Sequence, residues 1–188
     1  TARVKPLSDV GNGGATFDLF IQPDDDGNRQ ISLRSDNAGD ALRFLGTYDS
    51  MQDGNLTITG EYQDNVEGYP LIGNLSINDF RIVDAPILAQ VLNIMALTGI
   101  LDALSGDGIG FSSLDAPFLY HEGVLQLQSA HANGTSLGFT AEGHVYQDAD
   151  VVDIRGTVVP AYALNSVLGN IPVLGKLFQN SADSVTRD

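Results

Sequence analysis

Alternation of apolar and polar side chains is the feature that most constrains the fold of this chain. Apolar residues recur at every second position in eight segments, which turn-forming Gly, Asn, Asp and Pro residues separate. Successive side chains of a β-strand point to opposite faces of a sheet, so this period is typical of strands with one buried face. The segments are Thr16–Ile21, Gln30–Arg34, Asn55–Gly60, Leu71–Val83, Ile109–Tyr120, Val124–Ala130, Leu137–Tyr146 and Val151–Val159. The sequence therefore predicts a mainly antiparallel sheet.

Three strands lead directly into apolar helices, which gives the chain a weak internal repeat. The repeated units cover residues 31–46, 75–95 and 152–169. Residues with a known preference for helix ends mark the boundaries. They are Asp36 as an N-cap, Pro86 and Pro160 at first helical positions, and Gly46 and Gly169 after the last turns. We expect an α+β fold in which a curved sheet, an open groove or half-barrel, carries about three helices on its concave face or ends. The expected helices cover 36–45, 87–104 and 161–168.

The run APILAQVLNIMALTGIL at residues 85–101 contains no charged side chain. A membrane-spanning helix needs about 20 apolar residues, and this run is shorter and includes Pro86, Gln90 and Asn93. A helix over 87–104 would nevertheless be apolar nearly all round. Such a helix is either buried in a protein core or faces something apolar that is not protein. Both interpretations, core helix and lipid-facing helix, remain open from the sequence.

Composition narrows the class of partner. The 188 residues suit one domain, which we place at 1–178, followed by a polar tail at 179–188 that we expect to be disordered. The net charge is −15, and no Lys or Arg lies between Ile82 and Ile154. Nucleic-acid binding and electrostatic docking on anionic lipid both need basic residues, so neither is expected. The absence of cysteine excludes disulfides and thiolate zinc sites.

Two motifs resemble catalytic or calcium-binding patterns and fail on their context. Gly134–Gly138 matches the G-x-S-x-G nucleophile elbow, but Ser136 would lie in a turn between strands rather than before a helix. The acidic run 24–28 lacks the Gly and Glu of an EF-hand at the required positions, which hold Arg29 and Ser35. We interpret both as hairpin turns. A hydrolase that uses Ser136 is kept only as a weak alternative.

The three histidines, His121, His131 and His144, do not converge in the predicted hairpins, so no metal site is expected. No paired carboxylates or phosphate-binding loop stand out either. The sequence therefore predicts no catalytic residue, no metal and no cofactor, and it favours binding or scaffolding over catalysis.

Several stretches, taken in order, resemble a known family. They are Asn78–Pro86 (NDFRIVDAP), Gly106–Phe111 (GDGIGF), Gly134–Gly143 (GTSLGFTAEG), Asp153–Tyr162 (DIRGTVVPAY) and Leu164–Gly175 (LNSVLGNIPVLG). In order and spacing they resemble the C-terminal region of the AsmA-like family, in the branch that includes YhdP. The resemblance extends from about residue 30 to residue 176.

The resemblance implies a function without catalysis. Members of the family are large envelope proteins, usually tethered to the inner membrane by one N-terminal helix. Their periplasmic part is a long curved β-structure with an apolar groove, and they are implicated in moving phospholipid between the inner and outer membranes. We therefore expect a periplasmic module whose partners are phospholipid acyl chains, together with proteins of the inner or outer membrane. The expected lipid contacts are Leu92, Met95, Leu101, Ile171 and Leu174.

The end of the chain departs from the family pattern. The family continues with a Gly-rich turn and a further strand, whereas residues 179–188 are polar. If that strand is missing, a sheet edge is exposed and self-association through it is expected. The alternative function is structural: an end-cap or protein-docking domain of the envelope that binds no lipid itself.

Overall fold

The computed structural model describes residues 2–4, 15–94, 96–149 and 151–160. They form one antiparallel sheet whose nine strands follow one another in chain order, with β1 and β9 at its two edges. The strands are β1 (Ala2–Val4), β2 (Phe17–Pro23), β3 (Arg29–Ser35), β4 (Met51–Tyr62), β5 (Leu71–Ile82), β6 (Ile109–His121), β7 (Val124–Gly134), β8 (Leu137–Tyr146) and β9 (Val151–Pro160). The predicted fold class, a curved and open antiparallel sheet with a few helices, is confirmed.

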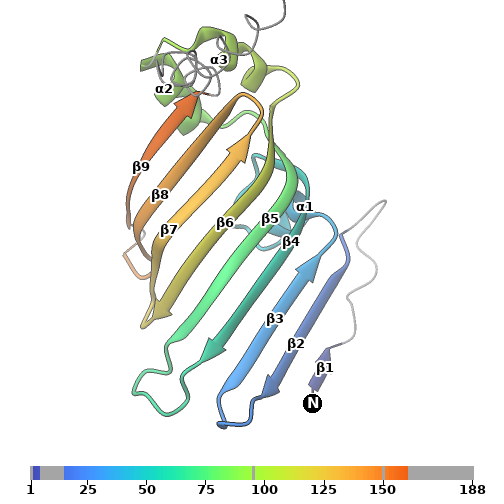
Figure 1. Ribbon diagram of the computed structural model, residues 1–188, viewed down its shortest axis with the longest axis vertical. Helices are drawn as coiled ribbons and strands as arrows, with labels where there is room; N and C mark the ends of the chain where they lie inside the picture. The colour runs from blue at the N-terminus through green and yellow to red at the C-terminus, as the bar shows by residue number, and fades with distance from the viewer. Residues whose placement is uncertain (1, 5–14, 95, 150, 161–188) are drawn as a thin grey trace, which may run out of the picture.

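Three helices occupy two of the connections at one end of the sheet. They are α1 (Ala38–Phe44) between β3 and β4, and α2 (Pro86–Ile94) and α3 (Thr98–Ser105) between β5 and β6. Figure 1 shows α2 and α3 beyond the upper ends of the strands, and α1 behind β4 and β5. The strand-then-helix repeat is thus present in its first two units. The third predicted helix, 161–168, and the tail at 179–188 lie outside the described residues.

The prediction of one helix over 87–104 is wrong, because the chain breaks between α2 and α3. Ala96 has a positive φ of 55°. Its N–H donates to the Asn93 carbonyl (3.0 Å), and the Leu97 N–H donates to the Leu92 carbonyl (2.9 Å). This is the Schellman pattern that ends helices, with an alanine where glycine is usual. Leu92 and Leu97 are both buried, which supplies the apolar contact that accompanies the motif.

Helix α1 ends in the same way, with the expected glycine. Gly46 has a φ of +66°, and the Thr47 N–H donates to the Leu42 carbonyl (3.0 Å). Its N-cap is one residue later than predicted: Asn37 Oδ1 accepts from the Asp40 N–H at 2.9 Å. Asp36 instead accepts from the Thr16 N–H at 2.7 Å, and this hydrogen bond lowers the pKa of the Asp36 carboxyl.

The main core lies between the helices and one face of the sheet. Phe80 on β5 stacks on Phe111 of β6 at 5.2 Å between ring centroids, and Phe111 meets Phe139 edge-on at 5.5 Å. Leu92 of α2 and Leu104 of α3 are buried in the same cluster. This end of the molecule is therefore closed by protein.

Candidate functional site

The face of the sheet that carries the helices continues as an apolar surface toward the opposite end. Directly paired residues of neighbouring antiparallel strands place their side chains on the same face. One such row begins at the buried Ile77, which pairs with Leu56 on β4 and with Leu114 on β6. Rows farther from the helices hold the following residues, which we call the open strip: Leu19, Ile21, Ile31, Leu33, Leu71, Leu125, Leu127, Val145, Val152 and Ile154.

The open strip extends from β2 to β9. Its outermost row, which holds Leu71 and Val152, reaches Arg29 on β3, whereas its middle row contains no charged side chain. Its middle row pairs Ile21, Ile31, Gly60, Gly73, Phe118, Leu127, Gly143 and Ile154 in succession. Strands lie about 4.8 Å apart, so eight strands give this row a length of about 34 Å. The hydrocarbon core of one bilayer leaflet is about 15 Å thick. The row is therefore more than twice as long as one leaflet is thick.

Members of the open strip are partly or fully exposed, in contrast to the core. The exposed fraction is 38% for Ile21, 42% for Ile154 and 64% for Val152. The other members are half-buried, and Phe118, at the centre of the middle row, is buried with 9% exposure. Among the described residues, α1, α2 and α3 lie at the other end of this face and leave the strip uncovered (Figure 1).

Glycines let large side chains lie flat within the strip. A Cβ on Gly73 would lie 2.6 Å from the ring of Phe118, and a Cβ on Gly60 would lie 2.8 Å from Leu71 Cδ1. The ring and the leucine therefore cover the two glycines directly. Such cross-strand cover of glycine keeps this part of the surface smooth and apolar.

The opposite face of the sheet is polar. A cross-strand row on it holds Thr57, Ser76, Asp115, His131, Thr140 and Thr157. Asp115 Oδ2 accepts from Asn74 Nδ2 at 2.8 Å and from the Ser76 hydroxyl at 3.1 Å. A hollow of about 430 Å³ on this face is lined by Phe20, Ser32, Thr59, Ile72 and neighbouring polar groups. This face thus carries mostly polar side chains, with single exposed apolar ones such as Phe20 and Ile72.

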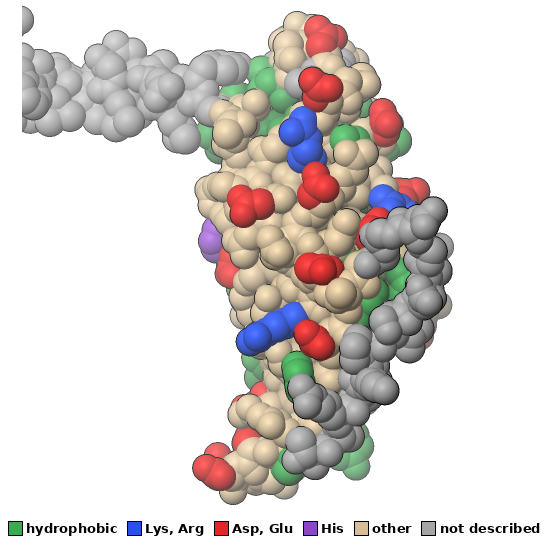
Figure 2. All heavy atoms as spheres, turned by 90° about the vertical axis from the view of Figure 1, so that its right-hand side faces the viewer, with side chains coloured by type: hydrophobic (Ala, Val, Ile, Leu, Met, Phe, Trp, Pro, Cys, Tyr) green, Lys and Arg blue, Asp and Glu red, His purple; other side chains and the backbone are tan. Residues whose placement is uncertain are grey.

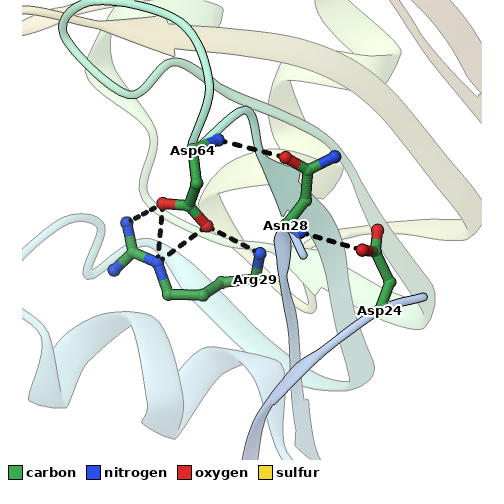
Figure 3. A network of polar contacts seen from close by, with 4 residues as sticks. All are labelled: Asp24, Asn28, Arg29 and Asp64. Atoms are coloured by element: carbon green, nitrogen blue, oxygen red, sulfur yellow. Dashed lines mark hydrogen bonds and ion pairs between the residues drawn. The ribbon is translucent and has the colours of Figure 1, made fainter. Parts of the chain in front are cut away.

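A polar network fixes the sheet at the far end from the helices (Figure 3). Asp64, in the β4–β5 loop, accepts from the Arg29 backbone N–H at 2.8 Å and from Arg29 Nη2 at 2.6 Å. Asn28 Oδ1 accepts from the Asp64 N–H at 3.2 Å, and the Asn28 N–H donates to Asp24 at 2.8 Å. The guanidinium hydrogen bonds lower the pKa of the Asp64 carboxyl. The acidic run 24–28 is therefore a hairpin turn, as the sequence predicted, and the structure adds that this turn is tied to the β4–β5 loop.

Most of the predicted lipid contacts lie where the structure gives no test. Met95, Ile171 and Leu174 are outside the described residues, and so is the side chain of Leu101 on α3. Leu92 is 0% exposed and packs against protein in the closed core. The open strip was not singled out from the sequence. Its signal was the strand alternation itself, which shows that these side chains share a face but not that the face is uncovered.

The candidate catalytic serine and the three histidines lie in a turn and in strands, as in many β-sheet proteins without an active site there. Ser136 lies in the short connection between β7 and β8, so no helix follows it as a nucleophile elbow requires. His121 ends β6, His131 lies within β7 and His144 lies within β8. In the described part of the chain, no three potential metal ligands come together. None of the helices there is long and apolar enough to span a membrane.

Acidic side chains are scattered singly over the side of the molecule shown in Figure 2, where basic ones are few.

Comparison of the chain with family models, with curated proteins and with solved structures finds no match. The resemblance to the AsmA-like family therefore stays a prediction from sequence motifs.

Proposed function

We propose that this chain is a non-enzymatic periplasmic module of an AsmA-like protein, which shields phospholipid acyl chains from water on the open strip. The observation that carries the proposal is the strip itself: an apolar surface whose uncharged middle row is continuous over eight strands and that α1, α2 and α3 leave uncovered. Soluble proteins rarely leave large contiguous apolar surfaces exposed unless those surfaces bind something.

Acyl chains fit this surface physically. Each CH₂ group removed from water contributes about 0.8 kcal/mol, so even a chain that is covered on one side gains substantially. The strip has no group that could form a specific polar contact with a chain, which suits passive movement along it. Headgroups would stay in solvent at the rim, where the described chain offers Tyr62, Tyr120 and the Arg29–Asp64 pair.

A matched pair of variants on β2 tests the proposal. Ile21 and Phe20 are neighbours with 38% and 37% exposure, but Ile21 belongs to the open strip and Phe20 lies on the polar face. The wild type should co-purify with phospholipid, detected by mass spectrometry of an organic extract. Ile21→Glu should lower the bound lipid by about tenfold, which corresponds to about 1.4 kcal/mol, because a carboxylate would have to be buried beneath the chain. Phe20→Glu should retain wild-type lipid.

Two results would contradict the proposal. One is a folded wild-type protein whose extract contains no phospholipid. The other is an equal loss of lipid in Phe20→Glu and Ile21→Glu, since binding would then not depend on the face.

The alternative function, an end-cap or docking domain without lipid binding, is favoured by one observation. Leu92, Leu97 and Leu104 are buried by other protein side chains, so the helical end behaves as an ordinary core. A folded wild-type protein whose organic extract contains no phospholipid would favour this alternative.

A further inference from the structure

Among the described strands, β9 forms one edge of the sheet, and apart from two charged side chains, Asp153 and Arg155, it has few of the usual protections of an edge strand. All ten of its residues pair with β8 without a register shift, whereas β6 and β7 both contain irregularities. Natural edge strands are commonly short, bulged, rich in lysine or interrupted by proline. In β9 the only proline is Pro160 at its end, and it contains no lysine. Its residues from Val151 to Thr157 are exposed.

We infer that β9 pairs with β9 of a second copy of this chain, antiparallel and centred on Ile154. The inference goes beyond lipid handling, because the pairing does not require lipid. The side chains of the strand favour one register of this pairing over the others.

The faces restrict the possible registers first. A shift of one residue moves every side chain to the other face of a sheet. A two-fold axis that passes between two residues would therefore place Ile154 beside Arg155 of the second copy, with an apolar face against a polar one. Only an axis through a residue keeps the apolar faces of both copies on the same side.

Charges then select among the remaining registers. With the axis through Asp153 or through Arg155, two like charges lie directly opposite each other, which is destabilising. With the axis through Ile154, Asp153 lies opposite Arg155 of the second copy, and this pair occurs twice by symmetry. An axis through Val152 or Gly156 leaves both charges without an opposite charge directly across the new interface.

Asp153 and Arg155 are available for this role. The ion pairs that the described residues form, Arg29–Asp64 and Arg43–Asp40, involve neither of them. Within its own sheet, Asp153 lies opposite His144, and Arg155 lies opposite Glu142. Arg155 would therefore lie between two carboxylates in the dimer, one from each copy.

The dimer would also join the two open strips. Ile154 would pair with Ile154 of the second copy, so the row through Leu127, Gly143 and Ile154 would continue into its counterpart. The apolar surface would then extend over sixteen strands, with a helical end at each of two opposite corners.

Charge-reversal variants test the register, and because several variants are compared, the result does not depend on the folding of any single one. We expect the full chain to form a dimer without added lipid. Sedimentation equilibrium at protein concentrations of about 1–300 μM should detect it, since a small interface gives a weak dimer. Asp153→Arg and Arg155→Asp should each raise the dissociation constant by about a hundredfold or more, since each places like charges opposite each other twice. The double variant D153R/R155D should restore the wild-type dimer.

Mixing the two single variants gives the decisive result. Asp153→Arg and Arg155→Asp chains should form a heterodimer with each other, because both cross-strand pairs are then attractive. Circular dichroism of each variant verifies its fold. A monomeric wild type over the whole range would overturn the proposal, and so would folded single variants that fail to associate on mixing. Lipid in the organic extract of monomeric variants would leave the proposed function intact, so the two proposals fail separately.

Discussion

The two ends of one sheet face are both apolar, but one end is buried and the other is partly exposed to solvent. Near the helices, Ile77 and Phe80 on β5 are 1% and 2% exposed, whereas Leu71, on the same face and the same strand, is partly exposed. The face is apolar at both ends, although the alternation of β5 is interrupted near the helices, where Asp79 has a positive φ of 55° and both Ile77 and Phe80 lie in the core. What differs is the cover: α1, α2 and α3 are inserted into two connections at one end only. Strand alternation therefore determines which side chains share a face, and the connections determine whether that face becomes core.

Truncation of one apolar side chain in each region should separate the two ends most strongly. Phe80→Ala removes a buried ring that stacks on Phe111, and we expect it to lower the free energy of unfolding by about 3–5 kcal/mol. Leu71→Ala, on the same strand in the open strip, should cost about 1 kcal/mol because its side chain is only partly covered. Urea unfolding measures both. Equal losses would mean that the strip is also core.

The close fit of α1 on the sheet should give the next largest effect. A Cβ on Gly39 would lie 2.9 Å from Gln52 Cα and closer still to the Met51 carbonyl oxygen. Gly39→Ala should therefore destabilise the closed end by about 1–3 kcal/mol, since backbone atoms must shift. Gly99→Ala in α3 is the control: nothing lies within 4 Å of its Cβ position, so no loss is expected. If Gly39→Ala unfolds at the wild-type urea concentration, α1 does not pack as described.

The matched helix ends predict effects of opposite sign. Ala96→Gly should stabilise the protein by about 1 kcal/mol, because it relieves an alanine held at positive φ after α2. Gly46→Ala at the equivalent position after α1 should destabilise it by a similar amount, although space is free there. Thermal unfolding of both variants provides the measurement. Changes of the same sign would contradict the shared Schellman geometry.

The smallest effect is expected from the network at the far end of the strip. The pKa of Asp64 is lowered in the folded protein, so the contribution of its pair with Arg29 is fully present above the unfolded pKa of about 4. It is lost as the pH falls below that value and through the lowered folded pKa. Wild type should thus lose more stability than Asp64→Asn between neutral pH and pH about 3. Parallel pH profiles of unfolding for the two proteins would be inconsistent with this pair.

Particular residues show where sequence reasoning succeeds and where it stops. Alternation located the eight longer strands, and Pro86 and Gly46 correctly marked helix boundaries because their backbone preferences are strong. The break at Ala96 gave no signal, since alanine favours helix and its positive φ is imposed by the packing of Leu92 and Leu97. Asp36 and Asn37 are adjacent capping residues, so the choice between them depended on the contact of Asp36 with Thr16.

The open strip depended on information that local sequence does not hold. The strand alternation predicts that a side chain such as Leu127 belongs to the core. Whether it is exposed depends on which part of the sheet the helices cover. The same limit applies to Leu92, which was predicted to contact lipid and is buried by protein.

Labelling of single cysteines tests most directly whether the open strip receives acyl chains. The chain has no cysteine, so Ile21→Cys and Phe20→Cys each offer one site for a polarity-sensitive fluorophore, on opposite faces of β2. On addition of phosphatidylcholine vesicles, we expect a blue shift for the label at position 21 and none for the label at position 20. A shift at both positions, or at position 20 alone, would contradict it.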